Sequence, residues 1–390
     1  MQRSWVIAGG GTGGHVTPAL ALGEELQRRG EKVLFIGSER GLEAQLVPES
    51  GFELVALPSQ QVMGRSIAGR LRGALGILAS VGRARTELKR CRANAVLSVG
   101  GYAAMPAALA ALTRRTPLFL VEPNAVPGRV NRLCARFARR VFVGFEAAAK
   151  ALGGAAKRSE CTGVPLRAAL VESFAVAGPG AAKDAEPRPG RVPRRKPHAP
   201  FRLLVFGGSQ GARQINHAMM RAAPHLAGLG IEIFHQAGEA DREAVLGAYA
   251  DAGLPVEVVA FERNMPARYA WADIAVCRAG ALTVAELALS GLPALLVPYP
   301  YAADDHQAAN ARELERAGAA RRLEGLEDSD ESGARLAGIL AELFAAPERL
   351  VAMGEAASSL ARPGAAARII DLCTQSLSED GEPGAAKEAG

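Results

Sequence analysis

The sequence has few cysteines, and no two of them form the Cys-x-x-Cys pairs that are typical of structural zinc sites. Cysteines that are scattered in this way also argue against a disulfide framework and favour a reducing compartment. The sequence therefore predicts a fold that depends on its own cores rather than on covalent or metal cross-links. The five cysteines are Cys91, Cys134, Cys161, Cys277 and Cys373.

Long apolar runs are missing as well. No uninterrupted apolar stretch approaches the roughly 20 residues of a membrane-spanning helix. The first residues, MQRSWVIAGGG, pass directly into an expected strand and lack the apolar core of a signal peptide. With 49% hydrophobic and 22% charged residues in a chain of 390, the composition is that of a globular protein with room for about two domains.

Acidic residues are scarce only in the first half of the chain. Residues 1–170 contain 24 Lys and Arg against 11 Asp and Glu, a net charge of +13, whereas residues 201–390 contain 16 against 26, a net charge of −10. The first half is therefore expected to face an anionic surface, either nucleic acid or anionic lipid. We favour lipid, because no interleaved aromatic residues and no recognisable DNA or RNA module accompany the basic residues.

Residues 272–310 contain the clearest candidate site. A helix that begins near 281–283 is expected between two short buried strands, and the unpaired N–H groups of such a helix N-terminus suit a phosphate. Glu286, one turn later, is suited to accept two hydrogen bonds from a ribose diol. Gly280 by itself has the simpler explanation of a tight turn. The pattern predicts a pocket for a nucleotide with a polyhydroxylated group, completed by the polar run Asp304, Asp305, His306, Gln307 and Asn310.

A glycine-rich turn at Gly9–Gly14 follows an expected strand at Ser4–Ala8 and formally matches the GxGxxG pattern. The next helix is expected from about Thr17, where the following proline suits a first turn. A dinucleotide site would also need an acid at the end of the next strand, but Glu39 lies past a glycine, so NAD binding is disfavoured. His15, at the mouth of the turn, is a candidate general base or a residue that caps and packs the helix.

The succession of strand, glycine turn and helix recurs at Gly100-Gly101-Tyr102 and again at 207–212. Glu122 leaves the carboxyl end of another buried strand, where α/β enzymes place functional groups. The pattern predicts an α/β protein of two Rossmann-like domains that face an interdomain cleft. The expected parts are a first domain at 1–167, a Pro- and Arg-rich linker at 176–200, a second domain at 201–350, a helix near 358–375 that packs back on the first domain, and a mobile tail at 376–390.

Residues 65–92 are basic and amphipathic, with eight Lys or Arg, one acid and apolar residues at helical spacing. Such a helix lies in a membrane interface, or it is an ordinary helix with an apolar inner stripe and a solvated basic face. A second basic segment at 128–140 contributes Arg129, Arg132, Arg136, Arg139 and Arg140 and leaves both interpretations open. The residues expected to face a membrane are Arg72, Leu75, Leu78, Val81, Arg83 and Arg85.

Taken together, these motifs resemble the MurG family of GT-B glycosyltransferases. The resemblance covers residues 5 to about 375, apart from the linker, and its motifs agree in order and spacing. It rests on Gly10–His15 with Thr17-Pro18, Gly100-Gly101-Tyr102, Glu122-Pro123-Asn124, Gly207–Ala212, and Cys277–Thr283 continuing to Glu286.

The resemblance implies inverting transfer of N-acetylglucosamine from UDP-GlcNAc to the muramyl 4-hydroxyl of lipid I, which forms lipid II. It implies His15 or its rival Glu122 as the base and does not decide between them. Gly100, Gly101 and Tyr102 would lie on the acceptor side. The donor residues that it implies are Thr12, Gly13, Gly14, Asn124, Arg167, Ser209, Glu262, Ala281, Leu282, Thr283, Val284, Ala285, Glu286, Gln307 and Asn310.

No cofactor and no metal are expected, because helix N-termini can stabilise a diphosphate in place of a cation. The only DxD motif, Asp328-Ser329-Asp330, is interpreted as a solvated acidic loop. The expected partners are UDP-GlcNAc, lipid I and anionic inner-leaflet lipids, at the cytoplasmic face of a bacterial inner membrane. The alternatives are another GT-B enzyme, such as a natural-product glycosyltransferase or a UDP-GlcNAc epimerase, and a nucleotide-binding membrane scaffold without catalysis.

Overall fold

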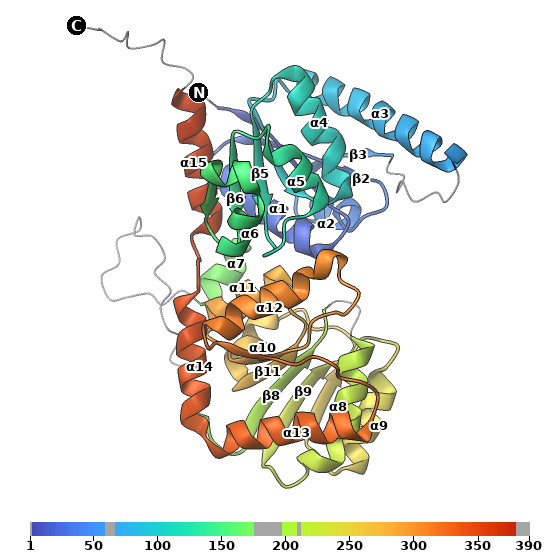
Figure 1. Cartoon of the computed structure of the whole chain (residues 1–390), viewed down its shortest axis with the longest axis vertical. Coiled ribbons are helices and arrows are strands. Elements are labelled where there is room, and N and C mark those ends of the chain that lie inside the picture. Colours follow the sequence, from blue (N-terminus) through green and yellow to red (C-terminus); the bar gives the residue numbers. More distant parts are fainter. Residues whose placement is uncertain (1, 59–66, 175–196, 209–211, 380–390) are drawn as a thin grey trace, which may run out of the picture. The chain divides into compact units, whose positions relative to one another are not determined.

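The computed structural model describes residues 2–58, 67–174, 197–208 and 212–379, and residues 67–75 are described for their backbone only. The chain divides into two compact units (Figure 1). Unit 1 comprises Met1–Ala168 and Gly364–Gly390, and unit 2 comprises Ala169–Pro363. Most of the linker expected at 176–200 lies outside the described residues, as does the tail beyond residue 379.

In its described residues, unit 1 forms a seven-stranded sheet whose neighbouring strands are all parallel. Parallel neighbours cannot be joined by a tight turn, so helices carry the chain from one strand to the next. In spatial order the strands are β3 (Glu53–Leu57), β2 (Lys32–Ser38), β1 (Ser4–Gly9), β4 (Ala95–Gly100), β5 (Leu118–Glu122), β6 (Arg140–Val143) and β7 (Ser159–Cys161).

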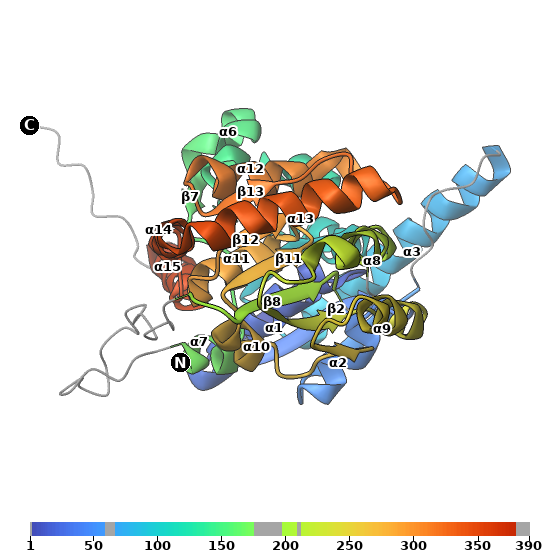
Figure 2. The same cartoon turned by 90° about the horizontal axis from the view of Figure 1, so that it is seen from below.

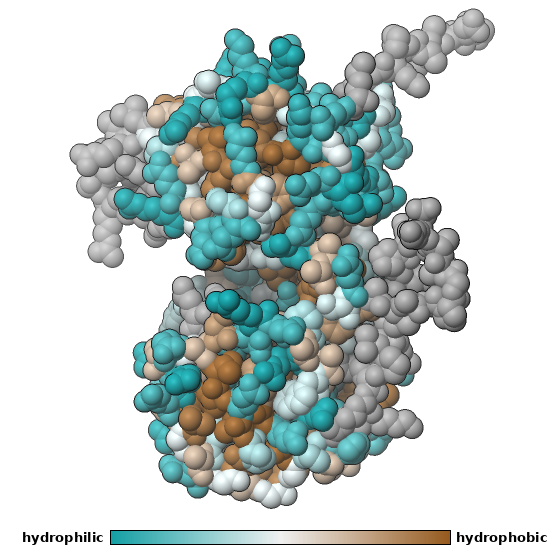
Figure 3. Space-filling model, turned by 180° about the vertical axis from the view of Figure 1, so that it is seen from behind, coloured by the Kyte–Doolittle hydropathy of each residue, from teal (hydrophilic) through white to brown (hydrophobic). Residues whose placement is uncertain are grey.

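Side chains of β1 alternate between the two faces of this sheet and enter two separate cores. Val6 and Ala8 pack with residues of α3, α4 and α5, whereas Trp5 and Ile7 pack with residues of α1 and α15. Figure 3 shows apolar residues gathered towards the middle of each unit and bordered by hydrophilic ones. The helices are α1 (Gly13–Arg28), α2 (Glu43–Glu49), α3 (Ile67–Arg90), α4 (Met105–Arg114), α5 (Arg129–Ala135), α6 (Glu146–Ala151) and α15 (Ala365–Glu379). Helix α7 (Ala168–Ser173) begins at the boundary, and all but its first residue belongs to unit 2.

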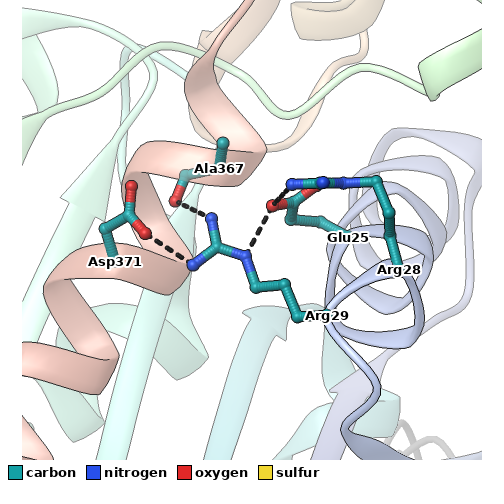
Figure 4. Close-up of polar contacts among 5 residues, drawn as sticks. All are labelled: Glu25, Arg28, Arg29, Ala367 and Asp371. Atoms are coloured by element: carbon teal, nitrogen blue, oxygen red, sulfur yellow. Dashed lines mark hydrogen bonds and ion pairs between the residues drawn. The ribbon is translucent and has the colours of Figure 1, made fainter. Parts of the chain in front are cut away.

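The C-terminal helix α15 packs on unit 1, and several polar contacts hold it there. Arg29, the C-cap residue of α1, donates to Asp371 at 2.5 Å, and this contact is drawn in Figure 4. Arg139 donates to the hydroxyl of the buried Ser376 at 2.6 Å. Residues 376–379, which were expected in the mobile tail, are therefore the last residues of this helix.

In its described residues, unit 2 forms a second parallel sheet, of six strands. The prediction of two Rossmann-like α/β sheets is thus confirmed. In spatial order the strands are β10 (Val256–Val259), β9 (Ile231–Gln236), β8 (Phe201–Phe206), β11 (Ile274–Cys277), β12 (Ala294–Leu296) and β13 (Ala320–Arg322). The helices are α8 (Arg213–Leu226), α9 (Arg242–Asp251), α10 (Met265–Trp271), α11 (Ala281–Ser290), α12 (His306–Arg316), α13 (Asp330–Ala345) and α14 (Pro347–Ser359).

The first helix begins earlier than the sequence predicted. The expected start was Thr17, but α1 begins at Gly13 and contains Pro18 in its second turn. This start costs one helical hydrogen bond, because the N–H that proline lacks would have paired with the carbonyl oxygen of Gly14. The earlier start places His15 inside the first turn of a helix rather than in the turn before it. By contrast, the expected start of a helix near residues 281–283 is confirmed by α11.

Among the described residues, no helix combines the length and the apolar character that a membrane span requires.

Close packing of α13 on α8 gives a stability test (Figure 2). A β-carbon at Gly333 would lie 2.6 Å from Cβ of Arg221 and would overlap the backbone of α8. We expect Gly333→Ala to lower the free energy of unfolding by about 1–3 kcal/mol, because the methyl group forces the two helices apart. Urea or thermal unfolding measures the change.

The matched control is Gly338→Ala in the same helix. Gly338 is exposed, and a β-carbon there would meet no described atom within 4 Å. This variant is expected to gain about 0.5–1 kcal/mol from helix propensity. Equal stability of the two variants would contradict the close approach at Gly333.

Candidate functional site

The first glycine turn carries β1 into α1 and places His15 in the first turn of that helix. Thr12 is the N-cap residue, and its carbonyl oxygen accepts from the backbone N–H groups of His15 and Val16, both at 3.1 Å. The Thr12 hydroxyl also lies 3.2 Å from Nδ1 of His15. The half-buried imidazole is thereby held in place while part of it stays accessible, as a general base requires.

Among the described residues, nothing requires Gly13 and Gly14 to be glycine. A β-carbon at Gly13 would meet no described atom within 4 Å, and one at Gly14 would meet only Thr12 Oγ1 at 3.8 Å. Neither residue has a positive φ. The absence of side chains there leaves space beside the N-terminus of α1, which is the space that a ligand would need.

The turn after β4 lies against this glycine turn. Gly100 and Gly101 have positive φ values of 90° and 78°. A β-carbon at Gly101 would lie 2.5 Å from the carbonyl oxygen of Gly10 and 3.5 Å from Nδ1 of His15. Tyr102 is 37% exposed, and a β-carbon at Gly11 would lie 3.0 Å from Cε1 of its ring. The structure therefore brings together the predicted acceptor residues and the candidate base.

Glu122, the rival candidate base, is 1% exposed and holds a loop. One carboxylate oxygen accepts from the backbone and side-chain N–H groups of Asn124 at 3.0 and 3.4 Å. The other accepts from the backbone of Gly128 at 2.8 Å and from the amide of Asn131 at 2.9 Å. Burial raises the pKa of Glu122, and these hydrogen bonds oppose the rise. All the contacts of this carboxylate shape the segment after β5.

Two predicted donor residues of unit 1 are engaged in contacts within the unit. Asn124 is half-buried and bound to Glu122, as described above. Arg167 forms an ion pair with Glu24 of α1, with 2.6 Å between Nε and Oε1, and lies 3.5 Å from the hydroxyl of Ser50. Contact of either side chain with a donor remains a prediction.

In unit 2, helix α11 begins directly after β11 and has no side-chain cap. Val284 donates its backbone N–H to Gly280, so the N–H groups of the three preceding helical residues have no partner within the helix. Asn310 is fully buried, and its amide donates to the carbonyl oxygen of Ala279 at 3.0 Å, which fixes the turn ahead of α11. Ala281 and Val284 are buried, whereas Leu282, Thr283 and Ala285 are half-buried.

Glu286 lies on α11, half-buried, and receives one hydrogen bond from within the unit. The hydroxyl of the buried Tyr269 donates to its Oε2 at 2.7 Å, and Oε1 has no partner among the described residues. Burial raises the pKa of Glu286 to about 7, although the bond from Tyr269 favours the charged form. This carboxylate therefore changes charge near neutral pH.

Gln236 joins two turns at the same edge of the sheet, and sequence analysis missed it. It ends β9 and is 3% exposed. Its amide nitrogen donates to the carbonyl oxygen of Gly208 at 2.7 Å, and its amide oxygen accepts from the backbone of Glu262 at 3.1 Å. The signal that could have found it is a polar residue at the carboxyl end of an otherwise apolar strand. Ser209, the predicted diphosphate residue beside Gly208, lies outside the described residues.

Glu262 is held by its own neighbours. Its carboxylate accepts from the backbone of Asn264 and from Nε of Arg268, both at 2.7 Å. Burial acts to raise the pKa of Glu262, but these hydrogen bonds outweigh it and keep the pKa below its usual value. The side chain is thus tied down, and reading of a base by the backbone here remains a prediction.

A second residue that sequence analysis did not assign is Arg278, which follows β11. Its Nη1 donates to the carbonyl oxygens of Val297 and Pro298, both at 3.1 Å, and to Oε1 of Gln214 at 2.7 Å. In the segment after β12, the side-chain oxygen of Gln307 accepts from the backbone N–H of Tyr299 at 2.9 Å. Direct contact of Gln307 and Asn310 with a sugar remains a prediction.

The basic helices of unit 1 show which predicted surface residues are exposed. Leu78 is 66% exposed, and Arg83 and Arg85 are exposed beside it on α3. Val81 was expected to face a membrane, but it is half-buried and packs against the core of unit 1. The side chains of Arg72 and Leu75 lie outside the described residues.

The second basic segment divides in the same manner. Leu133 and Phe137 are 47% and 55% exposed, and Arg136 lies over the ring of Phe137 at 4.7 Å. Arg139 instead binds Ser376 of α15, and Arg140 lies 3.8 Å from Glu160. Leu133 and Phe137 are therefore exposed apolar side chains with the cation of Arg136 beside them. Arg139 and Arg140 instead make contacts within unit 1.

Acidic residues do not gather into a metal site in the described part of the chain, where no group of three or more His, Cys, Asp or Glu could hold an ion. Asp328 of the DxD motif pairs with Arg221 and His217, both at 2.9 Å. Asp330 is 85% exposed and pairs with the same arginine. Ser329 is the N-cap residue of α13 and Asp330 is its first residue, so the motif lies at the start of a helix rather than in a loop. Independence of metal remains a prediction.

Both units match domains of one known family. The glycosyltransferase family 28 N-terminal domain matches residues 5–143, and the C-terminal domain of the same family matches residues 202–369. A UDP-N-acetylglucosamine–N-acetylmuramyl-(pentapeptide) pyrophosphoryl-undecaprenol N-acetylglucosamine transferase from Pelobacter propionicus is 43% identical over 94% of this chain and 97% of its own.

A solved structure supports the same family relationship. The crystal structure of MurG from Acinetobacter baumannii has a TM-score of 0.75 and 30% identity and covers 96% of this chain and 99% of its own. A UDP-GlcNAc 2-epimerase from Neisseria meningitidis has a TM-score of 0.64 but only 14% identity, over 96% of this chain and 100% of its own. The second likeness shows the GT-B fold alone.

Proposed function

The chain belongs to the MurG family, within glycosyltransferase family 28, and we propose that its two units supply the two sides of one sugar transfer. It transfers N-acetylglucosamine from UDP-GlcNAc to lipid I and forms lipid II. The observation that carries this function is the 43% identity, which extends over 94% of the chain and so spans both units. We propose further that the acceptor is the 4-hydroxyl of the muramyl sugar and that transfer inverts the anomeric carbon.

Unit 2 is proposed to bind the donor through α11. The unpaired N–H groups at the start of this helix would face the diphosphate, with the positive end of the helix dipole behind them. Glu286 would accept from the ribose hydroxyls through Oε1, because Tyr269 already occupies Oε2. Gln236 would hold the segment around Glu262 at the distance from Gly208 that a uridine diphosphate needs.

Unit 1 is proposed to bind the acceptor beside His15. His15 would take the proton of the 4-hydroxyl as that oxygen attacks the anomeric carbon, and the bond to UDP would break on the opposite side. We prefer His15 to Glu122, because the Glu122 carboxylate is 1% exposed and already accepts four hydrogen bonds. Glu122 would then act by keeping the loop at Asn124 in place.

Transfer of radiolabelled sugar from UDP-GlcNAc to a short-chain lipid I analogue, with EDTA present, tests the function. We expect labelled disaccharide-lipid to form. His15→Ala is expected to lower turnover about 10²–10⁴-fold, as loss of a general base does, and to leave UDP affinity within about twofold.

Glu122→Gln is the matched comparison, since it keeps the shape of the side chain. If Glu122→Gln loses turnover at constant UDP affinity while His15→Ala does not, the base is Glu122. If UDP-GlcNAc binds and is only hydrolysed or epimerised, the acceptor assignment is wrong, and another GT-B activity replaces it.

The pKa of Glu286 predicts how donor binding depends on pH. A pKa of about 7 means that the carboxylate is charged above pH 7 and protonated below it, and only the charged form accepts from both ribose hydroxyls. The Kd for UDP-GlcNAc should therefore rise about tenfold between pH 8 and pH 6, if only the charged form binds. Both phosphates of UDP-GlcNAc stay ionised over this range. Isothermal titration calorimetry measures the effect.

The control for the pH effect is Glu286→Gln, which cannot ionise. Its affinity should be lower than that of the parent and flat between pH 6 and pH 8. Tyr269→Phe should move the midpoint of the parent curve to higher pH, since it removes the hydrogen bond that favours the charged form. The same pH dependence in Glu286→Gln as in the parent would exclude Glu286 as its source.

We propose that unit 1 docks on the cytoplasmic face of the bacterial inner membrane as a peripheral protein. Helices α3 and α5 pack in the same core of unit 1, so they cover the same face of its sheet. The exposed apolar side chains Leu78, Leu133 and Phe137 would enter the lipid interface, with Arg83 and Arg85 beside them. Each such cation is worth about 1 kcal/mol near an anionic surface.

Co-sedimentation with vesicles tests this docking. The parent should bind vesicles that contain phosphatidylglycerol and leave them as salt rises, and it should bind pure phosphatidylcholine weakly. The double variant Leu78→Ser and Phe137→Ser should lose about tenfold in affinity. Leu246→Ser is the control, because Leu246 is 46% exposed but lies on α9 of unit 2. Equal binding by the double variant and the control variant would exclude this face.

A further inference from the structure

Glu43, the first residue of α2, is fully buried, and none of the motifs above includes it. One carboxylate oxygen accepts from the backbone N–H of Gly11 at 2.8 Å. The other accepts from the backbone N–H and the hydroxyl of Ser38, at 2.8 and 2.5 Å. The carboxylate thus joins the first glycine turn to the end of β2. Among the described residues, no cation pairs with it.

Three glycines surround this carboxylate, and each must be glycine because of it. A β-carbon at Gly10 or at Gly41 would overlap a carboxylate oxygen of Glu43, and one at Gly37 would lie 2.6 Å from its Cγ. None of the three has a positive φ, so backbone conformation does not require them. Gly10 in the glycine-rich motif is therefore small to admit a side chain of the protein rather than a ligand.

The peptide between Gly10 and Gly11 is held from two sides. Glu43 binds the N–H of Gly11 from the side of β2. On the side of β4, the carbonyl oxygen of Gly10 lies so close to Gly101 that a β-carbon there would be 2.5 Å away. Gly11 keeps a positive φ of 92° between these contacts and leads directly into Thr12, which caps α1 and contacts His15.

We propose that Glu43 is a positioning residue, which sets the place of His15 through the Gly10–Gly11 peptide. The proposal rests on the proposed function of His15 as the base. It requires both carboxylate oxygens, since one accepts the backbone N–H of Gly11 and the other accepts that of Ser38. A glutamine side chain has the same shape but only one acceptor oxygen, so its NH₂ group would face one of these N–H groups.

The test compares Glu43→Gln with the parent and with Glu53→Gln in the transfer assay. Glu53 is the control because it lies on β3 of the same unit and is exposed. We expect Glu43→Gln to lower kcat about 10–100-fold, with the KM for UDP-GlcNAc and the Kd for UDP within about threefold of the parent. Glu53→Gln should match the parent throughout.

A double variant separates positioning from general loss of structure. If Glu43 acts through His15, then His15→Ala combined with Glu43→Gln should turn over at the rate of His15→Ala alone, because there is no base left to misplace. If the two losses multiply, Glu43 acts independently of His15 and the proposal is overturned. A parent kcat in a folded Glu43→Gln overturns it as well.

If Glu43→Gln does not fold, Ser38→Ala tests whether Glu43 positions His15. It removes one hydrogen bond from Glu43 and leaves the bond to Gly11 in place. We expect it to lower kcat about 2–5-fold with no further loss in combination with His15→Ala, and an unchanged kcat overturns the proposal. Failure of the proposed function is distinguishable, because the parent itself would then form no labelled disaccharide-lipid.

Discussion

Backbone N–H and carbonyl groups in the turns after parallel strands are the constraint on which the candidate site depends. These turns leave the ladder of the sheet, so their polar groups need other partners wherever they are buried. In unit 1 the carboxylates of Glu43 and Glu122 accept from such N–H groups. In unit 2 the amides of Gln236 and Asn310 donate to the carbonyl oxygens of Gly208 and Ala279, in the turns ahead of α8 and α11, and Gln236 also accepts from the backbone N–H of Glu262. The turns keep defined shapes because these side chains are buried with them.

Burial gives the acidic residues of the site different uses. Glu122 is enclosed by the N–H groups that it binds, so it is suited to hold a loop. Glu286 is half-buried, receives one hydrogen bond from Tyr269 and has a pKa of about 7, so it is suited to receive hydrogen bonds from outside the protein. Both residues are glutamates. They differ in the number of hydrogen-bond donors that the described part of the protein supplies, which is four for Glu122 and one for Glu286.

Positive charge in unit 1 likewise has two uses. Arg29 and Arg139 bind α15 and so attach the end of the chain to the first sheet. Arg83 and Arg85 are exposed on α3 and remain available to an anionic surface. The net charge of +13 over residues 1–170 therefore overstates the charge that a membrane would meet. The number of exposed cations, rather than the sum, is the quantity that governs docking.

The sequence by itself determined the two parallel sheets, the start of α11 and the identity of the family, because apolar runs, glycine turns and motif spacing are local properties. It did not determine that α1 begins at Gly13, since Pro18 signals a first turn. Nor did it reveal Glu43 or Gln236, whose partners are distant turns of the chain. Val81 was misassigned for the same reason: an apolar residue on an amphipathic helix faces inward or outward according to what packs there. Tertiary structure alone decided these points, because hydrogen bonding and burial depend on which segments meet.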